Sequence, residues 1–430
     1  MSNQIIQPRT LKGFRDFLPD DMRIREKVIN TFKQEFEKYG YEPLETPVLE
    51  YADILMGKYG EEAEQLMYTF EDRGGRKVAM KYDVTVPAAR VLAQYQNQLT
   101  LPFKRYQIQP VWRAENTQKG RLREFYQCDA DTFGTDSIIA EAEFIQMGIE
   151  ILKKLGFENF FAKINNRKII DGITQYAGIS KDQFASVCTT IDKLEKIGED
   201  GVKKELEERK ISNESITKIF EVISQKAESS LELLDKVSSI LATIPEAQKG
   251  VEELRKILNL LKAGGIKETF YKVDLSIIRG LAYYTGPIWE FEVTGGNVGS
   301  VGSGGRYDKL VGLYVGKDIP AAGGSFGIER LIEIIKERNM ISSDTQTTIL
   351  VTIFSSDLLE LSFKTANSLR SQGINTLLYP DENAKLDKQL KYANKKQIPY
   401  VVIIGPEEKA NNKVKLKNMK TGEQKEITVV

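Results

Sequence analysis

The 430-residue sequence contains no histidine. Without an imidazole side chain it can form no Ser-His-Asp triad, no Cys-His pair, no histidine-ligated zinc site and no imidazole proton shuttle. Any reaction near pH 7 must therefore use carboxylates, arginine, lysine, tyrosine, cysteine, a metal ion or the substrate's own groups. We expect chemistry that works by positioning and charge rather than by imidazole acid–base catalysis.

Cysteine is scarce, and no apolar run reaches the length of a membrane span. Cys128 and Cys188 form no CxxC pattern and suggest no disulfide framework, so we interpret them as small side chains in a reducing compartment. The first ten residues lack the apolar core of a signal peptide. These features predict a cytoplasmic protein with no membrane segment. The 61 basic and 61 acidic residues balance, which excludes a uniformly basic nucleic-acid coat but allows a local basic patch.

One helix and one hairpin are predicted in the N-terminal part of the chain. Apolar residues recur every four positions between the start signal at Pro19 and Gly40, which predicts an amphipathic helix. Segments 104–113 and 122–132 have strand-like patterns and are joined by a polar loop, which predicts an antiparallel hairpin.

The pattern along the chain predicts three domains. Residues 168–267 are rich in Lys, Glu, Leu and Ile at helical spacing and are predicted to form a helical insertion. Strands alternate with helices over residues 346–430, which predicts a small α/β domain. Residues 1–167 and 268–338 then form one discontinuous domain on either side of the insertion.

The predicted hairpin has the most specific pattern of charged and aromatic residues. Alternate residues of a strand share a face, so Arg113 and Glu115 lie together. On the returning strand the residues that share a face are Arg123, Phe125, Gln127, Asp129 and Asp131. Such a face offers a guanidinium, an aromatic plane, an amide and acids, which suit a phosphate, a purine ring and an ammonium group.

The loop of this hairpin contains Gln118, Lys119 and Arg121, which suit a nucleic-acid backbone or a polyphosphate. An ordinary surface hairpin with cross-strand ion pairs remains the alternative, and the charge pattern alone favours it.

Two further segments contain possible binding residues. Residues 279–290 place Arg279 beside Tyr283 and Tyr284, which is equally consistent with ligand contact and with half-buried packing at a turn. The glycines of residues 299–312 and 323–331 permit close approach of the backbone to a ligand, but no P-loop pattern is present.

These segments, in this order, resemble the histidyl-tRNA synthetases, a family of class II aminoacyl-tRNA synthetases. ETPVLE is similar to motif 1, with Pro47 at the motif's proline. WRAE through FYQCDAD resembles motif 2, GIERL resembles motif 3, and LKGFRDFLPD resembles the family's N-terminal element. RGLAYYTG is similar to the RGLDYY signature of histidyl enzymes, with Ala282 in place of the usual Asp. The resemblance covers essentially the whole chain.

The resemblance implies an α+β catalytic domain on a mainly antiparallel sheet, with a helical insertion and a C-terminal α/β domain like an anticodon-binding domain. It also implies a homodimer through the region around Pro47. The expected substrates are ATP, L-histidine and histidine tRNA, with Mg²⁺ accompanying ATP through ligands that the resemblance does not identify. Gln118 and Lys119 would contact the acceptor end of the tRNA.

The resemblance also implies roles in binding ATP. Arg113 and Arg330 would contact the α- and γ-phosphates, and Arg121 would assist. Glu115 would bind the nucleotide, and Phe125 would stack on adenine.

A second set of residues is implied to bind histidine: Asp83, Thr85, Gln127, Asp131, Tyr283 and Tyr284. The first three would hold the α-ammonium group, and Asp131 and Tyr284 would hydrogen-bond the imidazole. Arg279 would contact the substrate carboxylate and the α-phosphate, so that Arg113, Arg279 and Arg330 are the expected catalytic residues.

The implied activation step needs no histidine. An ionised carboxylate attacks the α-phosphate of ATP, so alignment and positive charge are required rather than a general base. Two alternatives remain. One is a paralogue that serves as regulatory subunit of ATP phosphoribosyltransferase, which generally lacks the C-terminal domain and loses motif residues. The other is a tRNA-binding sensor with a degenerate site. The intact motif arginines favour the enzyme over both.

Overall fold

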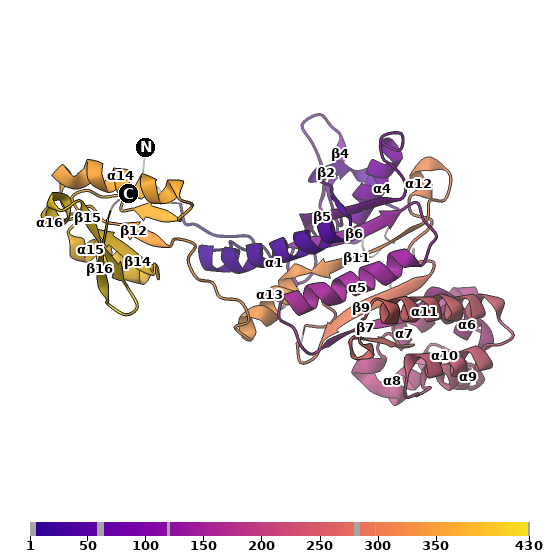
Figure 1. Cartoon of the computed structure of the whole chain (residues 1–430). Coiled ribbons are helices and arrows are strands. Elements are labelled where there is room, and N and C mark those ends of the chain that lie inside the picture. Colours follow the sequence, from indigo (N-terminus) through magenta and orange to yellow (C-terminus); the bar gives the residue numbers. More distant parts are fainter. Residues whose placement is uncertain (1–5, 58–63, 118–120, 279–283, 297, 429–430) are drawn as a thin grey trace. The chain divides into compact units, whose positions relative to one another are not determined.

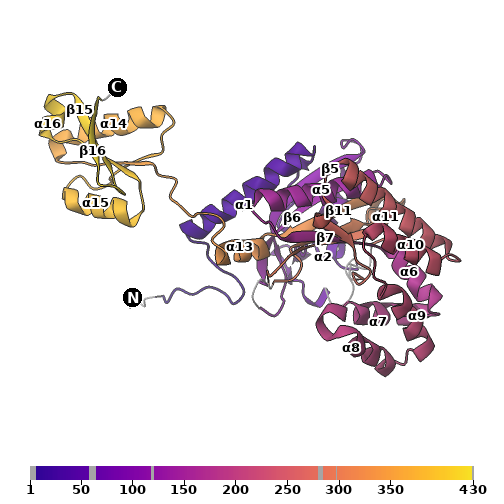
Figure 2. The ribbon, with the colours of Figure 1, turned by 60° about the horizontal axis from the view of Figure 1, so that its bottom comes forward.

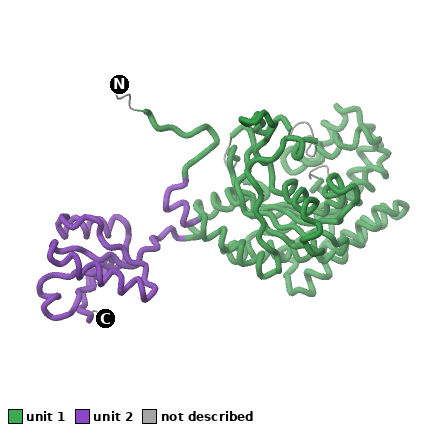
Figure 3. Tube along the Cα trace, turned by 90° about the horizontal axis from the view of Figure 1, so that it is seen from above, with its two compact units in different colours: residues 1–16, 25–341 green, residues 17–24, 342–430 purple. Residues whose placement is uncertain are grey.

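The structure is a computed structural model that describes residues 6–57, 64–117, 121–278, 284–296 and 298–428. These residues divide into two compact units (Figure 3). One unit comprises residues 1–16 and 25–341, and the other comprises residues 17–24 and 342–430.

The first unit is built on an eight-stranded sheet in the order β1-β5-β6-β11-β10-β9-β7-β8. Among the described strands, β1 with β5 and β7 with β8 are its parallel pairs, and the others are antiparallel, which confirms the mainly antiparallel sheet. The strands are β1 Glu42–Pro43, β5 Phe103–Trp112, β6 Glu124–Phe133, β7 Phe160–Asn166, β8 Tyr271–Val273, β9 Pro287–Val293, β10 Gly302–Arg306 and β11 Ala321–Gly327.

The predicted hairpin is present as β5 and β6, which pair from Phe103 opposite Phe133 to Trp112 opposite Glu124. Directly opposed residues of an antiparallel pair point to the same face. This register therefore decides which side chains of the two strands become neighbours.

Helices cover one face of the sheet (Figure 1). The predicted N-terminal helix is α1 Pro19–Lys38, whose Phe32 ring lies 5.1 Å from that of Phe326 on β11. Helix α5 Ile139–Lys154 places Phe144 5.2 Å from Trp289 on β9. Figure 2 shows α1 and α5 side by side, and their surfaces are joined by an ion pair of 2.7 Å between Lys38 and Glu150. Helix α13 Ile328–Glu337 packs on β6.

Every regular element described between β7 and residue 263 is a helix, as the spacing of apolar residues predicts. Helix α11 packs against α6, α10 and α5, and Gly172 on α6 allows the close approach because a Cβ there would lie 2.6 Å from that of Ala247. The helices are α6 Arg167–Tyr176, α7 Lys181–Ile191, α8 Leu194–Glu208, α9 Asn213–Ile223, α10 Ser230–Ile240 and α11 Pro245–Ala263.

A three-stranded sheet in the order β2-β4-β3 adjoins short helices in the first unit. The segment after α1 contributes to both sheets, because β1 joins the large sheet and β2 the small one. These elements are β2 Leu49–Tyr51, α2 Ala52–Leu55, β3 Thr69–Glu71, β4 Lys77–Met80, α4 Thr85–Gln94 and α12 Gly312–Val315.

The second unit contains a five-stranded sheet in the order β13-β12-β14-β15-β16, flanked by helices. Its alternation of strands and helices agrees with the sequence prediction for residues 346–430. Its elements are β12 Ile349–Val351, α14 Leu359–Ser371, β13 Thr376–Leu378, α15 Leu386–Lys395, β14 Tyr400–Ile403, α16 Pro406–Ala410, β15 Lys413–Asn418 and β16 Gln424–Thr428.

The glycine-rich segments contribute strands β10 and β11 to the middle of the large sheet. A Cβ on Gly323 would overlap the carboxylate of Asp131 on β6. A Cβ on Gly305 would lie 2.8 Å from the ring of Tyr284. These glycines make room for side chains of neighbouring elements.

We predict that Gly323→Ala lowers the free energy of unfolding by about 1–3 kcal/mol, because the added methyl group has no space. Urea denaturation measures this change. Gly327→Ala on the same strand is the matched control, since its φ is −83° and its added Cβ would meet nothing closer than 3.7 Å. Equal losses in the two variants would contradict the packing argument.

Candidate active site

A cleft of about 850 Å³ opens on the face of the large sheet opposite α1 and α5. Ser325 and Phe326 both line the cleft, but the Ser325 hydroxyl accepts a hydrogen bond of 3.5 Å from Gln127, whereas the Phe326 ring packs on Phe32 of α1 and Phe144 of α5. Successive side chains of a strand point to opposite faces, so the cleft and the helices lie on opposite sides.

The alternate residues of β6 line this cleft together, as the strand pattern predicts: Phe125, Gln127, Asp129 and Asp131. Asp129 and Asp131 are almost fully buried. The hydroxyl of Thr85, at the start of α4, donates to Asp129 Oδ2 over 3.2 Å. Asp83 also lines the cleft, and its Oδ1 accepts a hydrogen bond of 3.1 Å from the backbone N–H of Val86.

Asp129 was placed on this face by the sequence pattern, but no role was predicted for it. Burial raises the pKa of Asp129 to about 7, against the opposing effect of the Arg105 guanidinium. Burial likewise raises the pKa of Asp131, again opposed by Arg105. Two buried acids side by side need cationic or N–H donors as partners at this end of the cleft.

Asp131 already has two partners inside the protein. The hydroxyl of Tyr307 donates to its Oδ1, and Arg105, which is fully buried, forms an ion pair with its Oδ2. A carboxylate offers about four acceptor positions, so it can accept a further donor from the cleft. Tyr284 lines the same region. The sequence pattern does not reveal Arg105 or Tyr307, because their shared partner Asp131 lies on another strand.

The other end of the cleft is rich in arginine. The Arg113 guanidinium lies 4.3 Å from the ring centroid of Tyr82 and 5.1 Å from that of Phe125, and its Nε donates to the carbonyl of Tyr82 over 3.0 Å. Arg121 and Glu115 form an ion pair of 3.4 Å. Arg330, in the first turn of α13, donates from Nη1 to the carbonyl of Ser300.

Glu329 anchors the start of α13 beside Arg330. Both of its carboxylate oxygens accept hydrogen bonds from the buried Arg25, over 3.0 and 2.7 Å, and Arg15 also pairs with it. The Arg25 guanidinium in turn lies 4.4 Å from the ring centroid of Tyr126 on β6. These contacts join α1, α13 and β6 at the wall of the cleft, which Tyr126 and Glu329 also line.

The corner between α7 and α8 also lines the cleft, which the sequence did not predict. Asp192, Glu195 and Lys196 are part of the lining. Lys163 on β7 pairs with Glu195 and, over 2.7 Å, with Glu292 on β9. The pattern of charges on these helices resembles an ordinary solvated face, so it carried no signal of this contact.

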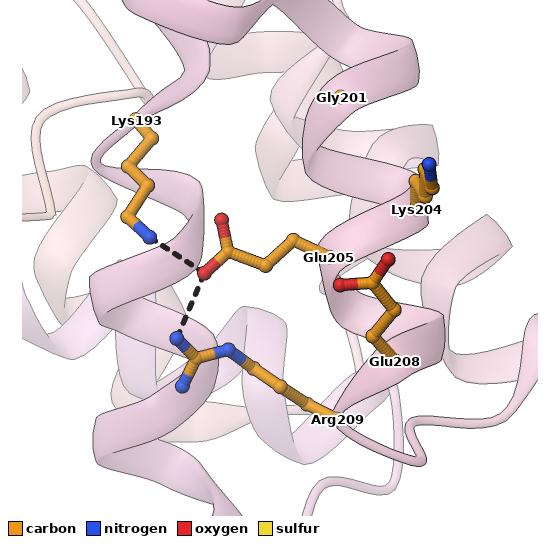
Figure 4. Close-up of a pocket in the computed structure, with 6 residues that line it drawn as sticks. All are labelled: Lys193, Gly201, Lys204, Glu205, Glu208 and Arg209. Carbon is orange, nitrogen blue, oxygen red and sulfur yellow. Dashed lines mark hydrogen bonds and ion pairs between the residues drawn. The ribbon is translucent and has the colours of Figure 1, made fainter.

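A smaller cleft lies within the helical segment, next to α8 (Figure 4). Lys193 and Arg209 both pair with Glu205, over 2.6 and 2.8 Å. Because Lys193 and Arg209 are already paired with Glu205, the large cleft is the stronger candidate for the active site.

Four of the residues implied to bind substrates lie outside the described residues: Gln118, Lys119, Arg279 and Tyr283. Ala282, where the signature departs from the family pattern, also lies outside them. The other implied residues all line the large cleft: Asp83, Thr85, Arg113, Glu115, Arg121, Phe125, Gln127, Asp131, Tyr284 and Arg330.

Family models, related sequences and a solved structure all place this chain in the same family. A family model described as histidyl-tRNA synthetase matches residues 13–331, and one described as an anticodon binding domain matches residues 348–430. Proteins named histidine–tRNA ligase from Wolinella succinogenes and Cytophaga hutchinsonii are 42% and 39% identical, over 98% of this chain in both cases and 96% and 98% of theirs. The crystal structure of histidyl-tRNA synthetase from Nostoc matches with a TM-score of 0.89 and 34% identity, over 99% of this chain and 97% of that chain.

We predict that Glu329→Gln lowers the free energy of unfolding by about 3 kcal/mol, because it removes the negative charge that accepts two hydrogen bonds from the buried Arg25. Glu333→Gln, one turn further along α13, is the control. Glu333 is partly exposed and pairs with Arg15 at 3.4 Å, so its loss should change stability by less than about 1 kcal/mol. Chemical denaturation of both variants measures the difference, and a similar small loss in each would show that the buried pair is dispensable.

Proposed function

The chain belongs to the histidyl-tRNA synthetase family and is a histidine–tRNA ligase, and we propose that histidine and ATP occupy opposite ends of its large cleft. The observation that carries this proposal is the distribution of charge along β6. Arg113 lies against Phe125 at one end of the strand, and Asp131 lies six residues further on. At about 3.3 Å per residue these ends are about 20 Å apart, enough for an amino acid and a nucleotide in line.

Histidine is proposed to bind at the acidic end. Gln127 Oε1 is a buried acceptor that receives no hydrogen bond from any described residue, and Asp129 beside it is an almost fully buried carboxylate. An α-ammonium group supplies three N–H donors, and buried acceptors of this kind require donors. We assign the ammonium group to Asp83, Thr85 and Gln127, now joined by Asp129.

The imidazole is proposed to lie against Asp131, Tyr283 and Tyr284. Tyr307 and Arg105 leave Asp131 with acceptor capacity on the cleft side, and an apolar amino acid would leave that buried acceptor without a donor. A site of that kind can discriminate by ~10⁴-fold or more.

ATP is proposed to bind at the arginine-rich end, with adenine on the Phe125 ring and the phosphates on Arg113, Arg121 and Arg330. Glu115 binds the nucleotide. The histidine carboxylate attacks the α-phosphorus in line, pyrophosphate leaves, and histidyl-adenylate forms. Arg113, Arg279 and Arg330 stabilise the charge that develops on the phosphate oxygens, without any proton transfer by imidazole.

Mg²⁺ is proposed to enter with ATP. No group of three or more possible metal-ligating acids or cysteines occurs in the part of the chain that the structure describes. This fits Mg²⁺, which takes most of its ligands from nucleotide phosphates and water and needs one or two carboxylates from the protein. Glu115 and Glu290 are lining carboxylates suited to that role. Bound there, the ion would neutralise phosphate charge.

The tRNA is proposed to contact both units of the protein. Gln118 and Lys119 contact its acceptor end, residues 168–267 form an insertion domain, and residues 346–430 bind the anticodon.

No helix among the described residues has both the length and the apolarity that a membrane crossing requires. We propose that the protein works in the cytoplasm.

A homodimer is proposed through the motif 1 region around Pro47. Large apolar side chains on and beside β2 and β3 are 42–54% exposed: Val48, Leu49, Tyr51, Met56 and Phe70. Exposed apolar side chains gathered on one small sheet favour burial against a second copy.

The enzymatic proposal is tested by ATP–pyrophosphate exchange with each amino acid in turn. We expect exchange with histidine and not with the other amino acids. In Asp131→Ala the histidine KM should rise about 10- to 100-fold, because a hydrogen bond to a charged group is lost, while the ATP KM stays unchanged. Silence of the wild-type protein with every amino acid would contradict the enzyme, and an unchanged histidine KM would remove Asp131 from the pocket.

The dimer is tested by sedimentation of Tyr51→Asp. A charge on this surface cannot be buried without a partner, so we expect the mass to fall from that of a dimer to that of a monomer at micromolar concentration. Tyr400→Asp, an exposed aromatic residue of the second unit, is the control and should leave the mass unchanged. A wild-type protein that sediments as a monomer refutes the dimer.

A further inference from the structure

A second polar row lies beside the row that lines the cleft. On β5 the alternate residues Arg105, Gln107 and Gln109 stand directly opposite Asp131, Asp129 and Gln127 of β6. The β6 residues line the cleft, whereas the β5 residues do not. Arg105 and Gln107 are fully buried. Buried polar side chains that touch no substrate need another explanation.

These residues form one hydrogen-bonded chain that ends in the motif 1 segment. Arg105 Nη1 donates to Gln107 Oε1 over 3.3 Å, and Gln107 Nε2 donates to Thr46 Oγ1 over 2.7 Å. Gln107 Nε2 also donates to Gln109 Oε1, which accepts from Lys81 Nζ over 2.8 Å. Lys81 is fully buried and donates as well to the carbonyl of Thr46 over 3.1 Å.

The orientation of each amide in this chain is determined by its neighbours. Arginine has donors only, so the Gln107 atom that faces Arg105 must be its oxygen, and its NH₂ group must face Thr46 and Gln109. Lysine also has donors only, so Gln109 must present its oxygen to Lys81. A single arrangement satisfies every member, and the Thr46 hydroxyl and Gln109 Oε1 are the two acceptors that keep the Gln107 oxygen directed at Arg105.

We propose that Thr46 and Gln107 are positioning residues for the histidine pocket, acting through Arg105 on Asp131. Gln107 holds one side of the Arg105 guanidinium, and the other side pairs with Asp131. Without the Thr46 acceptor, the Gln107 amide keeps only Gln109 as an acceptor for its NH₂ group, so its oxygen is held less firmly against Arg105 and the guanidinium is held less firmly beside Asp131. This inference rests on the proposed role of Asp131 in binding imidazole.

The test compares Thr46→Val with Thr46→Ser. Valine keeps the shape of threonine but has no acceptor, whereas serine keeps the hydroxyl. Thr46 is buried and does not line the cleft. We expect Thr46→Val to raise the histidine KM about 3- to 10-fold in pyrophosphate exchange, a size typical of coupling through a side-chain network. The ATP KM of Thr46→Val should stay within about twofold of wild type. Thr46→Ser, which keeps the hydroxyl, should leave the histidine KM close to the wild-type value.

A merely structural role for Thr46 predicts a different result, in which Thr46→Val lowers the unfolding temperature and leaves the histidine KM unchanged. That result overturns the proposal. If Asp131→Ala then still raises the histidine KM, Asp131 belongs to the histidine pocket but Thr46 and Gln107 do not position it. If Asp131→Ala also leaves the histidine KM unchanged, the assignment of Asp131 to the pocket fails too. Gln107→Met, which has a side chain of similar length with no amide, should give the same selective rise if Thr46→Val does not fold. Equal effects of Gln107→Met on the histidine and ATP KM values also contradict a positioning role for Thr46 and Gln107.

Discussion

The register between β5 and β6 is the constraint on which the site depends. Ten opposed pairs, from Phe103 with Phe133 to Trp112 with Glu124, turn one polar row of each strand to the same face. A slip by one residue would turn Asp131 and Gln127 toward the apolar side, where Phe326 meets the helices. The buried ion pair of Arg105 with Asp131 therefore both requires this register and opposes any other, since a shifted strand would leave both charges buried and unpaired.

Glycine on the neighbouring strand makes the acidic end of the cleft possible. Gly323 stands opposite Asp131 on β11, where any side chain would overlap the carboxylate. Gly305 leaves space for the Tyr284 ring in the same way. The middle of the sheet therefore has little side-chain packing on its cleft face. Apolar burial comes instead from the aromatic cluster on the opposite face, where the rings of Phe326 and Phe144 are stacked 5.8 Å apart.

The absence of histidine agrees with the chemistry of the cleft. Activation of a carboxylate by ATP requires cations held in place, and the structure holds Arg113 between two aromatic rings and Arg330 at the anchored start of α13. Guanidinium groups remain charged at all working pH values, so these contacts do not depend on a titrating partner. The imidazole of the reaction belongs to the substrate, and we propose that acids and hydroxyls of the protein recognise it.

Local patterns in the sequence were sufficient to predict the hairpin, the alternation from Phe125 to Asp131, helix α1 and the family, because each depends on residues near one another in the chain. They did not predict that the glycine-rich segments are central strands, since glycine has no hydrophobic period to reveal. Nor did they indicate Arg105, Tyr307 or Thr46, whose importance comes from partners far away in sequence: Tyr307 and Asp131 are separated by 176 positions. Sequence therefore determined which chemical groups this protein carries. The tertiary structure decided which of them meet, because burial and strand pairing bring distant charges together and leave each with few partners.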